Sequence, residues 1–329
     1  MRAVRNDGQH VMLDPRAPEP APEAGEAIVR PTRVAVGPGE VSVCRGEIPF
    51  TGVLGSEFVG VVESVEGEQG AELVGARVVA WPTIASPESE LARRGLSEHA
   101  PERQILGLRA RDGALAERVR LPVTSLTVVP PVIDDESAAM GVALARALHL
   151  ARVVATEHKP YITILGDGAQ ALLAAQALHG INASVRVLGE REKRFTLCEK
   201  WGIRHRALDE AGRRGDQDVV LVCERTAAML DAALGMVRPR GRVVIGGEPE
   251  AMAGIGSPLE VDAQRVAEQE VRLMGARGGR VGDALRAMTG GARPFDLASL
   301  VTRRMRLDDG VGAIRAASDP DALRVLVEV

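Results

Sequence analysis

Apolar and polar positions along the chain change their spacing near residue 130. Before that point, short β-branched runs at 27–29, 58–65 and 76–80 are separated by glycine, proline and acidic residues. Such runs predict strands, and their spacing is typical of a small antiparallel, barrel-like domain. Pro130-Pro131 then ends this region, and an acidic helix start leads into an Ala-rich helix predicted over 137–154.

Beyond residue 160, short buried runs alternate with helical patterns. The predicted strands cover 161–165, 184–188, 219–223, 242–245 and 271–275, with helices over 169–178 and 194–201 between the first of them. Alternation of this kind predicts a doubly wound parallel sheet with helices on both faces. The tail predicts helices near 282–288 and 309–317 and a last strand over 323–327. The fold class is therefore α/β with a second, strand-rich domain.

Composition narrows the class of protein. The chain has 329 residues, of which 45% are hydrophobic and 26% charged, which suits two soluble globular domains. The net charge is −4 without a basic block, so nucleic acid and anionic membranes are not expected partners. There is no apolar run of about 18 residues and no signal-peptide pattern. Three cysteines without paired spacing fit the reducing cytosol, and we expect a cytoplasmic protein.

A glycine-rich turn carries the strongest chemical signal. Gly166, Gly168 and Ala171 form a Gly-x-Gly-x-x-Ala pattern after an apolar strand and before a helix. The first glycine permits the tight turn, the second lets a pyrophosphate approach the backbone, and the alanine lets helix and strand pack closely. The helix N-terminus adds free N–H groups and partial positive charge. The pattern predicts a dinucleotide site, although a tight turn without ligand has the same pattern.

The end of the second strand bears on the choice between NAD and NADP. NAD-binding proteins usually place Asp or Glu there, and this chain has Gly189 followed by Glu190 and Arg191, with Arg194 nearby. A guanidinium can bind a 2′-phosphate bidentately, which favours NADP. In the alternative, the arginines are merely solvated at a helix start and Glu190 binds the ribose, so NAD is possible.

Several motifs resemble those of the medium-chain dehydrogenase/reductase superfamily, the fold of the zinc-containing alcohol dehydrogenases. They are PFTGVLGSEFVGVV at 49–62, RRGL at 93–96, LG at 106–107 with DGA at 112–114, and VRPRG at 237–241. The resemblance implies a GroES-like β-barrel catalytic-type domain over 1–133, a Rossmann domain over 134–277, and a return to the first domain over 278–329. It also implies a homodimer joined through the strand at 270–276, because an open apolar edge is a liability.

The same resemblance places the family's zinc ligands on residues that cannot bind zinc. The three catalytic ligand positions are Gly37, Ser56 and Val142, and the proton-relay position is Gly39. The four positions of the structural zinc are occupied by Ser86, Ser89, Ala92 and Ala100. Tetrahedral zinc needs thiolate, imidazole or carboxylate donors. We therefore expect no metal.

The resemblance also supplies the expected cofactor and catalytic residues. Predicted cofactor contacts are Gly166, Asp167, Gly168, Ala169, Gln170, Gly189, Glu190, Arg191 and Arg194, with Cys223, Glu224, Gly246 and Gly247 on the nicotinamide side. Ser56, Glu57 and Ser42 are the candidate catalytic groups near the vacated metal position. Glu57 is better explained by an ion pair with Arg324, because buried carboxylates are usually paired.

Two functions follow from these residues. The first is a zinc-independent NAD(P)(H)-dependent oxidoreductase that transfers hydride to or from a small-molecule carbonyl or a conjugated enone or quinone. The second is a catalytically inactive nucleotide-binding relative that acts as a sensor or interaction protein. The intact glycine turn favours the first, and the loss of the metal ligands and proton relay fits the second.

Overall fold

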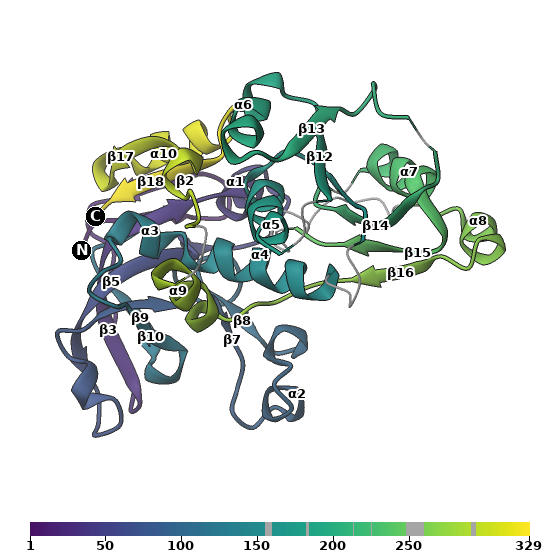
Figure 1. The fold of residues 1–329 in the computed structure, drawn as a ribbon. Coiled ribbons are helices and arrows are strands. Elements are labelled where there is room, and N and C mark those ends of the chain that lie inside the picture. Colours follow the sequence, from purple (N-terminus) through teal and green to yellow (C-terminus); the bar gives the residue numbers. More distant parts are fainter. Residues whose placement is uncertain (155–159, 182–183, 213, 225, 248–259, 291–293) are drawn as a thin grey trace. The chain divides into compact units, whose positions relative to one another are not determined.

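Two sheet-based units make up the chain, which confirms the α/β class with a GroES-like domain and a parallel sheet. The structure is a computed structural model and describes residues 1–329 except 155–159, 182–183, 213, 225, 248–259 and 291–293. The first unit comprises Met1–Val142, Arg280–Thr289 and Asp296–Val329, and the second comprises Ala143–Gly279 and Gly290–Phe295. Figure 1 shows both units, with most of their elements labelled.

The first unit is built mainly from short strands, as predicted. Its largest sheet has seven strands in the order β10-β6-β5-β3-β18-β17, with β9 also paired to β3, and β2-β1-β4 and β7-β8 form smaller sheets. The strands are β1 (Ala3–Asn6), β2 (Val11–Asp14), β3 (Glu26–Val36), β4 (Gly52–Val53), β5 (Glu57–Val65), β6 (Arg77–Ala80), β7 (Thr83–Ile84), β8 (Gln104–Ile105), β9 (Val119–Pro122), β10 (Leu126–Val128), β17 (Val301–Arg306) and β18 (Arg324–Glu328).

Short helices connect these strands. They are α1 (Pro38–Cys44), α2 (Glu90–Arg93), α3 (Asp135–Ala139), α9 (Val281–Thr289) and α10 (Gly310–Ala317). The predicted helix over 137–154 is in fact interrupted: α3 ends at its C-cap Met140 and the next helix starts at Gly141. Glycine is a poor helix former, which favours a break at this point. No helix among the described residues has the length and apolar character that a membrane span requires.

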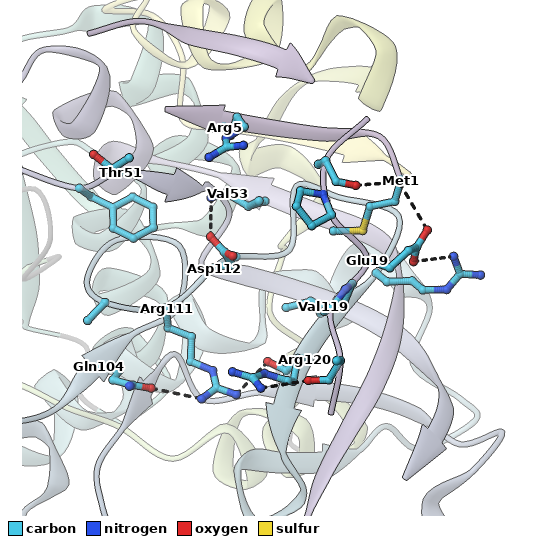
Figure 2. A pocket seen from close by; sticks show the side chains of 18 residues that line it. Met1, Arg5, Glu19, Thr51, Val53, Gln104, Arg111, Asp112, Val119 and Arg120 are labelled. Carbon is cyan, nitrogen blue, oxygen red and sulfur yellow. Dashed lines mark hydrogen bonds and ion pairs between the residues drawn. The ribbon is translucent and has the colours of Figure 1, made fainter. Parts of the chain in front are cut away.

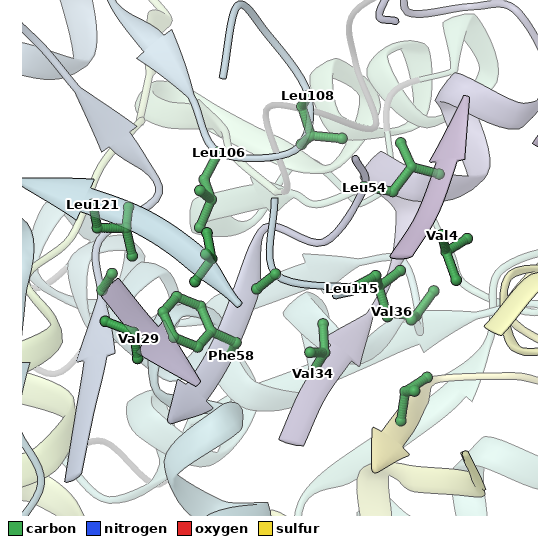
Figure 3. Close-up of a cluster of buried hydrophobic side chains, with 14 of the residues drawn as sticks. Val4, Val29, Val34, Val36, Leu54, Phe58, Leu106, Leu108, Leu115 and Leu121 are labelled. Atoms are coloured by element: carbon green, nitrogen blue, oxygen red, sulfur yellow. The ribbon is translucent and has the colours of Figure 1, made fainter. Parts of the chain in front are cut away.

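A buried hydrophobic cluster fills the first unit (Figure 3). Phe58 on β5 is 1% exposed and packs with Val29 and Val34 of β3 and with Leu106 and Leu121 from later in the chain. Successive residues of a strand point to opposite faces, so one apolar face of each strand reaches this cluster.

A buried ion pair crosses the large sheet of this unit. Glu57 on β5 and Arg324 on β18 lie on the two neighbours of β3, and Arg324 Nη2 is 4.0 Å from Glu57 Oε2. Their side chains are only 6% and 1% exposed. The pairing of Glu57 with Arg324 that we expected from the sequence is therefore present.

The second unit carries the parallel sheet. Six strands run in the order β13-β12-β11-β14-β15-β16, and every pair is parallel. The order reverses at β11, the point at which ligands bind in doubly wound folds. The strands are β11 (Ile162–Leu165), β12 (Val185–Gly189), β13 (Arg204–Ala207), β14 (Gln217–Val222), β15 (Val237–Ile245) and β16 (Arg272–Gly275), and the helices are α4 (Gly141–Val154), α5 (Ala169–His179), α6 (Glu192–Trp201), α7 (Ala227–Met236) and α8 (Ala263–Glu268).

The last strand of this sheet, β16, is one of its two edges. Val271 just before it is 7% exposed, whereas Leu273 and Met274 are 38% and 37% exposed. An edge strand with exposed apolar side chains is open to pairing with another strand.

The ion pair across β3 yields the first testable prediction. Arg324→Met removes the guanidinium that faces the buried Glu57 carboxylate, and we expect the free energy of unfolding to fall by about 3–5 kcal/mol. The double variant Glu57→Gln/Arg324→Met should lose less, because no charge is then buried. Urea denaturation measures both.

A matched control exists on the neighbouring strand. Arg303 on β17 is 57% exposed and forms an ion pair of 3.6 Å with Asp319. Arg303→Met should therefore change stability by less than about 1 kcal/mol. Equal losses for the Arg324 and Arg303 variants would contradict a structural role for the buried pair.

Candidate functional site

The turn between β11 and α5 has the geometry that its glycines predict. Gly166 has φ = 111°, a left-handed conformation that favours glycine, and its N–H donates to the carbonyl of Leu188. Gly168 is the N-cap of α5 and has an extended backbone, without a side-chain cap. The first amides of a helix have no intrahelical acceptor. Ala169, Gln170 and Ala171 therefore present N–H groups that fit a phosphate.

The carboxyl ends of the central strands bring the other predicted cofactor residues to the same edge. Leu165 pairs in register with Leu188 of β12 and Val222 of β14, and Val222 pairs with Ile245 of β15. Gly189 is the last residue of β12 and is followed by Glu190 and Arg191. Cys223 and Glu224 follow β14, and Gly246 and Gly247 follow β15. The structure therefore gathers the predicted cofactor residues around the ends of four adjacent strands.

Asp167 is the most heavily bonded residue of this edge. Its Oδ2 accepts hydrogen bonds of 2.8 Å from the N–H groups of both Glu190 and Arg191. Its Oδ1 accepts from Arg191 Nη1 at 2.7 Å and from Arg194 Nη1 at 2.6 Å. The residue is 1% exposed. Asp167 therefore ties the glycine turn to the end of β12.

The charge of Asp167 is retained although the residue is buried. Burial by itself would raise the pKa of the Asp167 carboxyl, but the backbone hydrogen bond of Arg191 and the charge of Arg194 outweigh it and hold that pKa below its usual value. Arg194 is 7% exposed and also donates to the Asp167 carbonyl. Arg194 thus holds the turn in place, whereas the Arg191 side chain is 32% exposed and still faces solvent.

Gly189 is required by the position of Asp167. A Cβ at Gly189 would lie 2.5 Å from Asp167 Oδ2 and 2.6 Å from its Cβ. The glycine at the position where many NAD-binding proteins have an acid is therefore explained by packing, because the carboxylate reaches this place from the turn instead.

Glu224 also contacts the glycine turn. Its Oε1 accepts hydrogen bonds from the N–H groups of Asp167 at 3.1 Å and Gly168 at 3.2 Å. Cys223, just before it, is anchored through its N–H to the Leu165 carbonyl, and burial raises the pKa of its thiol. From the resemblance we expected Glu224 near the nicotinamide, but we did not predict that its carboxylate binds the turn.

In the first unit, the positions of the catalytic zinc ligands hold a different arrangement. Glu40 on α1 is 1% exposed, and its Oε2 accepts the Gly37 N–H at 3.0 Å. Its Oε1 accepts the N–H of Ser56 at 2.9 Å and the hydroxyl of Ser56 at 2.8 Å. One carboxyl group therefore bridges Gly37 and Ser56, the positions to which the resemblance assigns the first two zinc ligands.

The donors present in the first unit do not fit zinc. Gly37 and the buried Val142 offer no side-chain donor, and Ser56 alone is a poor ligand. Within the part of the chain that the structure describes, no group of three His, Cys, Asp or Glu side chains could hold a metal ion.

The positions of the structural zinc lie in a lobe closed by ordinary contacts. The Ser89 N–H donates to the Ser86 carbonyl, Ala92 lies on α2, and Ala100 is fully buried. Strands β7 and β8 pair at the base of the lobe, and the Trp81 indole donates to Glu98. Hydrogen bonds and packing thus connect the residues of this lobe.

The sequence contains a signal for the contact between Glu40 and Gly37. Gly37-Pro38-Gly39-Glu40 places proline at the first helical position and glutamate at the third, where a side chain can bond back to the N-cap amide. Of the catalytic candidates, Ser56 contacts Glu40 and Glu57 pairs with Arg324, whereas the Ser42 hydroxyl donates to Glu47 at 2.7 Å. Ser42 therefore belongs to a separate contact.

A cavity of about 600 Å³ in the first unit contains none of the predicted site residues (Figure 2). Three of its arginines form ion pairs with acidic side chains: Arg111 with Glu26 at 2.6 Å, Arg118 with Glu19 at 3.1 Å, and Arg120 with Glu23 at 3.0 Å. These pairs leave the cavity without a clear preference for a charged ligand.

Known proteins share the architecture and part of the sequence. Residues 23–131 match the alcohol dehydrogenase GroES-like domain family. The chain is 25% identical to sorbitol dehydrogenase of Halalkalibacterium halodurans over 94% of this chain and 93% of that one. It is 24% identical to L-threonine 3-dehydrogenase of Anaeromyxobacter sp. (strain K), over 94% and 92% of the two chains.

Solved structures show the same fold. An alcohol dehydrogenase (rspB) from Escherichia coli CFT073, complexed with NADH, matches with a TM-score of 0.89 and 19% identity over 100% of this chain and 99% of that one. A protein from Sinorhizobium meliloti 1021, named for a zinc-binding dehydrogenase and bound to NADP, has a TM-score of 0.86, 23% identity and the same coverage. The domain match thus covers residues 23–131, and the structural likenesses show the same fold over the whole chain.

The packing of Asp167 against Gly189 generates a prediction. Gly189→Ala forces the carboxylate away from its four donors, and we expect a loss of about 1–3 kcal/mol in the free energy of unfolding. The control Gly180→Ala meets its nearest atom at 3.5 Å, an ordinary contact, and should leave stability nearly unchanged. Thermal or urea denaturation compares the two variants, and equal stability would contradict the account of Gly189.

The buried Glu40 predicts a pH dependence of stability. Burial raises the pKa of the Glu40 carboxyl above the usual 4.5, while the hydrogen bonds from Gly37 and Ser56 oppose that shift. Between those two pKa values the folded state binds more protons than the unfolded state, so the free energy of unfolding falls as pH rises. The slope approaches about 1.4 kcal/mol per pH unit.

In the variant Glu40→Gln, position 40 does not titrate, so its contribution to the free energy of unfolding is the same at every pH. The difference between the wild type and this variant therefore changes with pH. Denaturation of the wild type and of Glu40→Gln above pH 4.5 should give curves that converge or diverge steadily. Glu68→Gln, which removes an exposed carboxylate of the same unit, should run parallel to the wild type. Parallel curves for all three proteins would show that ionisation of Glu40 does not lower the free energy of unfolding.

Proposed function

We propose that the chain is a zinc-independent, NAD(P)(H)-dependent oxidoreductase that transfers hydride to or from a small-molecule carbonyl or conjugated enone. The observation that carries this proposal is an intact dinucleotide turn in a protein whose metal-ligand positions hold Gly37, Ser56 and Val142. Hydride chemistry belongs to the nicotinamide, so a protein that lacks zinc can keep the reaction if it supplies hydrogen bonds to the substrate oxygen.

The relatives support a nicotinamide cofactor and small-molecule substrates. They are named sorbitol dehydrogenase, L-threonine 3-dehydrogenase and, at 25% identity over 69% of this chain, acryloyl-coenzyme A reductase from Sulfurisphaera tokodaii. The last name describes a conjugated acceptor, the substrate class that depends least on a metal. The structures bound to NADP and NADH support a dinucleotide on the glycine turn.

Binding would use groups already in position. The first amides of α5 would hold the pyrophosphate, and the nicotinamide would lie toward Cys223, Gly246 and Gly247. We propose that NADP is preferred because the half-exposed guanidinium of Arg191 can meet a 2′-phosphate. Arg194 would contribute indirectly, since it holds Asp167.

In the first unit, Ser56 is the polar group that we propose for the substrate oxygen. Its hydroxyl donates to the buried Glu40 carboxyl, whose raised pKa favours the protonated form. A protonated Glu40 can donate to Ser56 Oγ and leave the Ser56 hydroxyl free to donate to a substrate oxygen. This pair would hold a proton at the place where the family has its metal.

The alternative is a nucleotide-binding protein without turnover. The glycines at positions 37 and 39 remove a metal ligand and the proton relay, and the Glu224 carboxylate occupies part of the turn. For either function we also propose a cytoplasmic homodimer that pairs through the exposed edge of β16, with residues 1–133 and 278–329 as the catalytic-type domain and 134–277 as the cofactor domain.

Three measurements test the proposal. Protein purified without added zinc should contain far less than one zinc per chain by elemental analysis. It should bind NADPH or NADH by calorimetry, and it should oxidise or reduce members of a panel of enones, quinones, carbonyls and polyols. On an active substrate, Ser56→Ala should lower kcat by roughly 10²-fold. Ser64→Ala, on the exposed part of β5, is the control.

Each result has a distinct meaning. Stoichiometric, chelator-sensitive zinc would contradict zinc independence. Tight dinucleotide binding without turnover on the whole panel would favour the sensor. Failure to bind either dinucleotide would reject both functions, because both use the glycine turn.

A further inference from the structure

The glycine turn already holds an anion that belongs to the protein. Oε1 of Glu224 accepts both the Asp167 N–H at 3.1 Å and the Gly168 N–H at 3.2 Å. The Glu224 side chain also packs over Gly166, where a Cβ would lie 2.9 Å from Glu224 Cγ. These amides directly precede the first turn of α5, the end of a helix that attracts negative charge.

We infer that Glu224 is an internal competitor of the dinucleotide phosphates, and that its displacement determines the affinity of the cofactor site. The inference rests on the proposed function, since it concerns the same turn. A carboxylate so close to the first-turn amides repels a pyrophosphate. It also accepts hydrogen bonds from amides that would otherwise be available to the cofactor. A binding-competent site then requires the Glu224 side chain to leave, which lowers the apparent affinity.

Two carboxylates lie on this turn, and only one of them can leave. Asp167 is 1% exposed and accepts four hydrogen bonds, so its departure would strand buried donors. The Glu224 side chain is 31% exposed, accepts two hydrogen bonds and lies 3.9 Å from Arg191 Nη1. It can rotate into water while its backbone stays fixed, because the N–H of Cys223 holds the strand end to Leu165.

Replacement of the Glu224 carboxylate by a phosphate keeps a negative charge beside the arginines of this edge. Arg191 and Arg194 face Asp167, and Arg191 also lies near Glu224, so the positive groups of this edge are neutralised before any cofactor arrives. A phosphate that replaces the Glu224 carboxylate restores the same bonds to the amides and the same sign of charge beside Arg191. Glu224 therefore acts as a stand-in for the phosphate in the free protein.

The decisive variant is Glu224→Ala. It removes the competing anion, and calorimetric titration with NADPH and NADH should show binding about tenfold tighter than in the wild type. Glu224→Gln keeps an acceptor for the two amides but removes the charge, so its affinity should fall between the two. Glu268→Ala, which removes one exposed carboxylate from α8 of the same unit, should bind as the wild type does.

A second readout uses inorganic pyrophosphate and needs no cofactor. Pyrophosphate should raise the melting temperature of Glu224→Ala, and to a smaller extent of Glu224→Gln, more than that of the wild type or Glu268→Ala. If Glu224→Ala does not fold, the comparison of Glu224→Gln with the wild type still decides both measurements.

The two proposals fail in different ways. Dinucleotide binding of equal strength in the wild type and in both Glu224 variants would overturn the competition and leave the oxidoreductase proposal intact. Absence of dinucleotide binding, with pyrophosphate still favouring the Glu224 variants, would reject the proposed function and support the internal anion. Absence of dinucleotide binding, together with no effect of pyrophosphate on the wild type or on either Glu224 variant, would overturn both.

Discussion

The Asp167 carboxylate is the interaction on which the second unit depends. It lies between the glycine turn after β11 and the chain after β12, and it joins them through two backbone amides and two arginines. Gly189 has no side chain because this carboxylate needs its space, and Arg194 is buried because it binds the same oxygen. The shape of the turn, the absent acid at the end of β12 and the buried arginine thus have one cause.

In the first unit, the Glu40 carboxyl group has a similar structural role. When the ligands of a metal are absent, the polar groups around it need new partners, since buried donors without acceptors destabilise a fold. The Glu40 carboxyl provides acceptors for the Gly37 and Ser56 amides and for the Ser56 hydroxyl. In both units a side-chain carboxyl group therefore accepts backbone N–H groups at a predicted ligand position.

Local patterns made much of this predictable from the sequence. The β11 strand, the turn and α5 are contiguous, so apolar spacing and two glycines suffice to place them, and the resemblance of residues 49–62 predicted the Glu57–Arg324 pair. Strands β13 and β17 escaped prediction because Arg-His-Arg-Ala and Val-Thr-Arg-Arg-Met-Arg hide the apolar alternation. Glu224 binds the amides of Asp167 and Gly168, which lie 57 and 56 positions earlier in the sequence, and Glu40 and Ser56 are 16 positions apart. The spacing of residue types gives no information about contacts over such sequence separations.

The position of β18 has a consequence for synthesis of the chain. This strand, Arg324–Glu328, lies between β3 and β17 in the large sheet, and Arg324 carries the cation that faces Glu57. While the ribosome is still making the second unit, β3 lacks its pairing with β18, and the Arg324 guanidinium does not yet face Glu57. The first unit therefore stays incomplete until β18 has been synthesised, whereas the second unit, whose residues all precede number 296, can fold earlier.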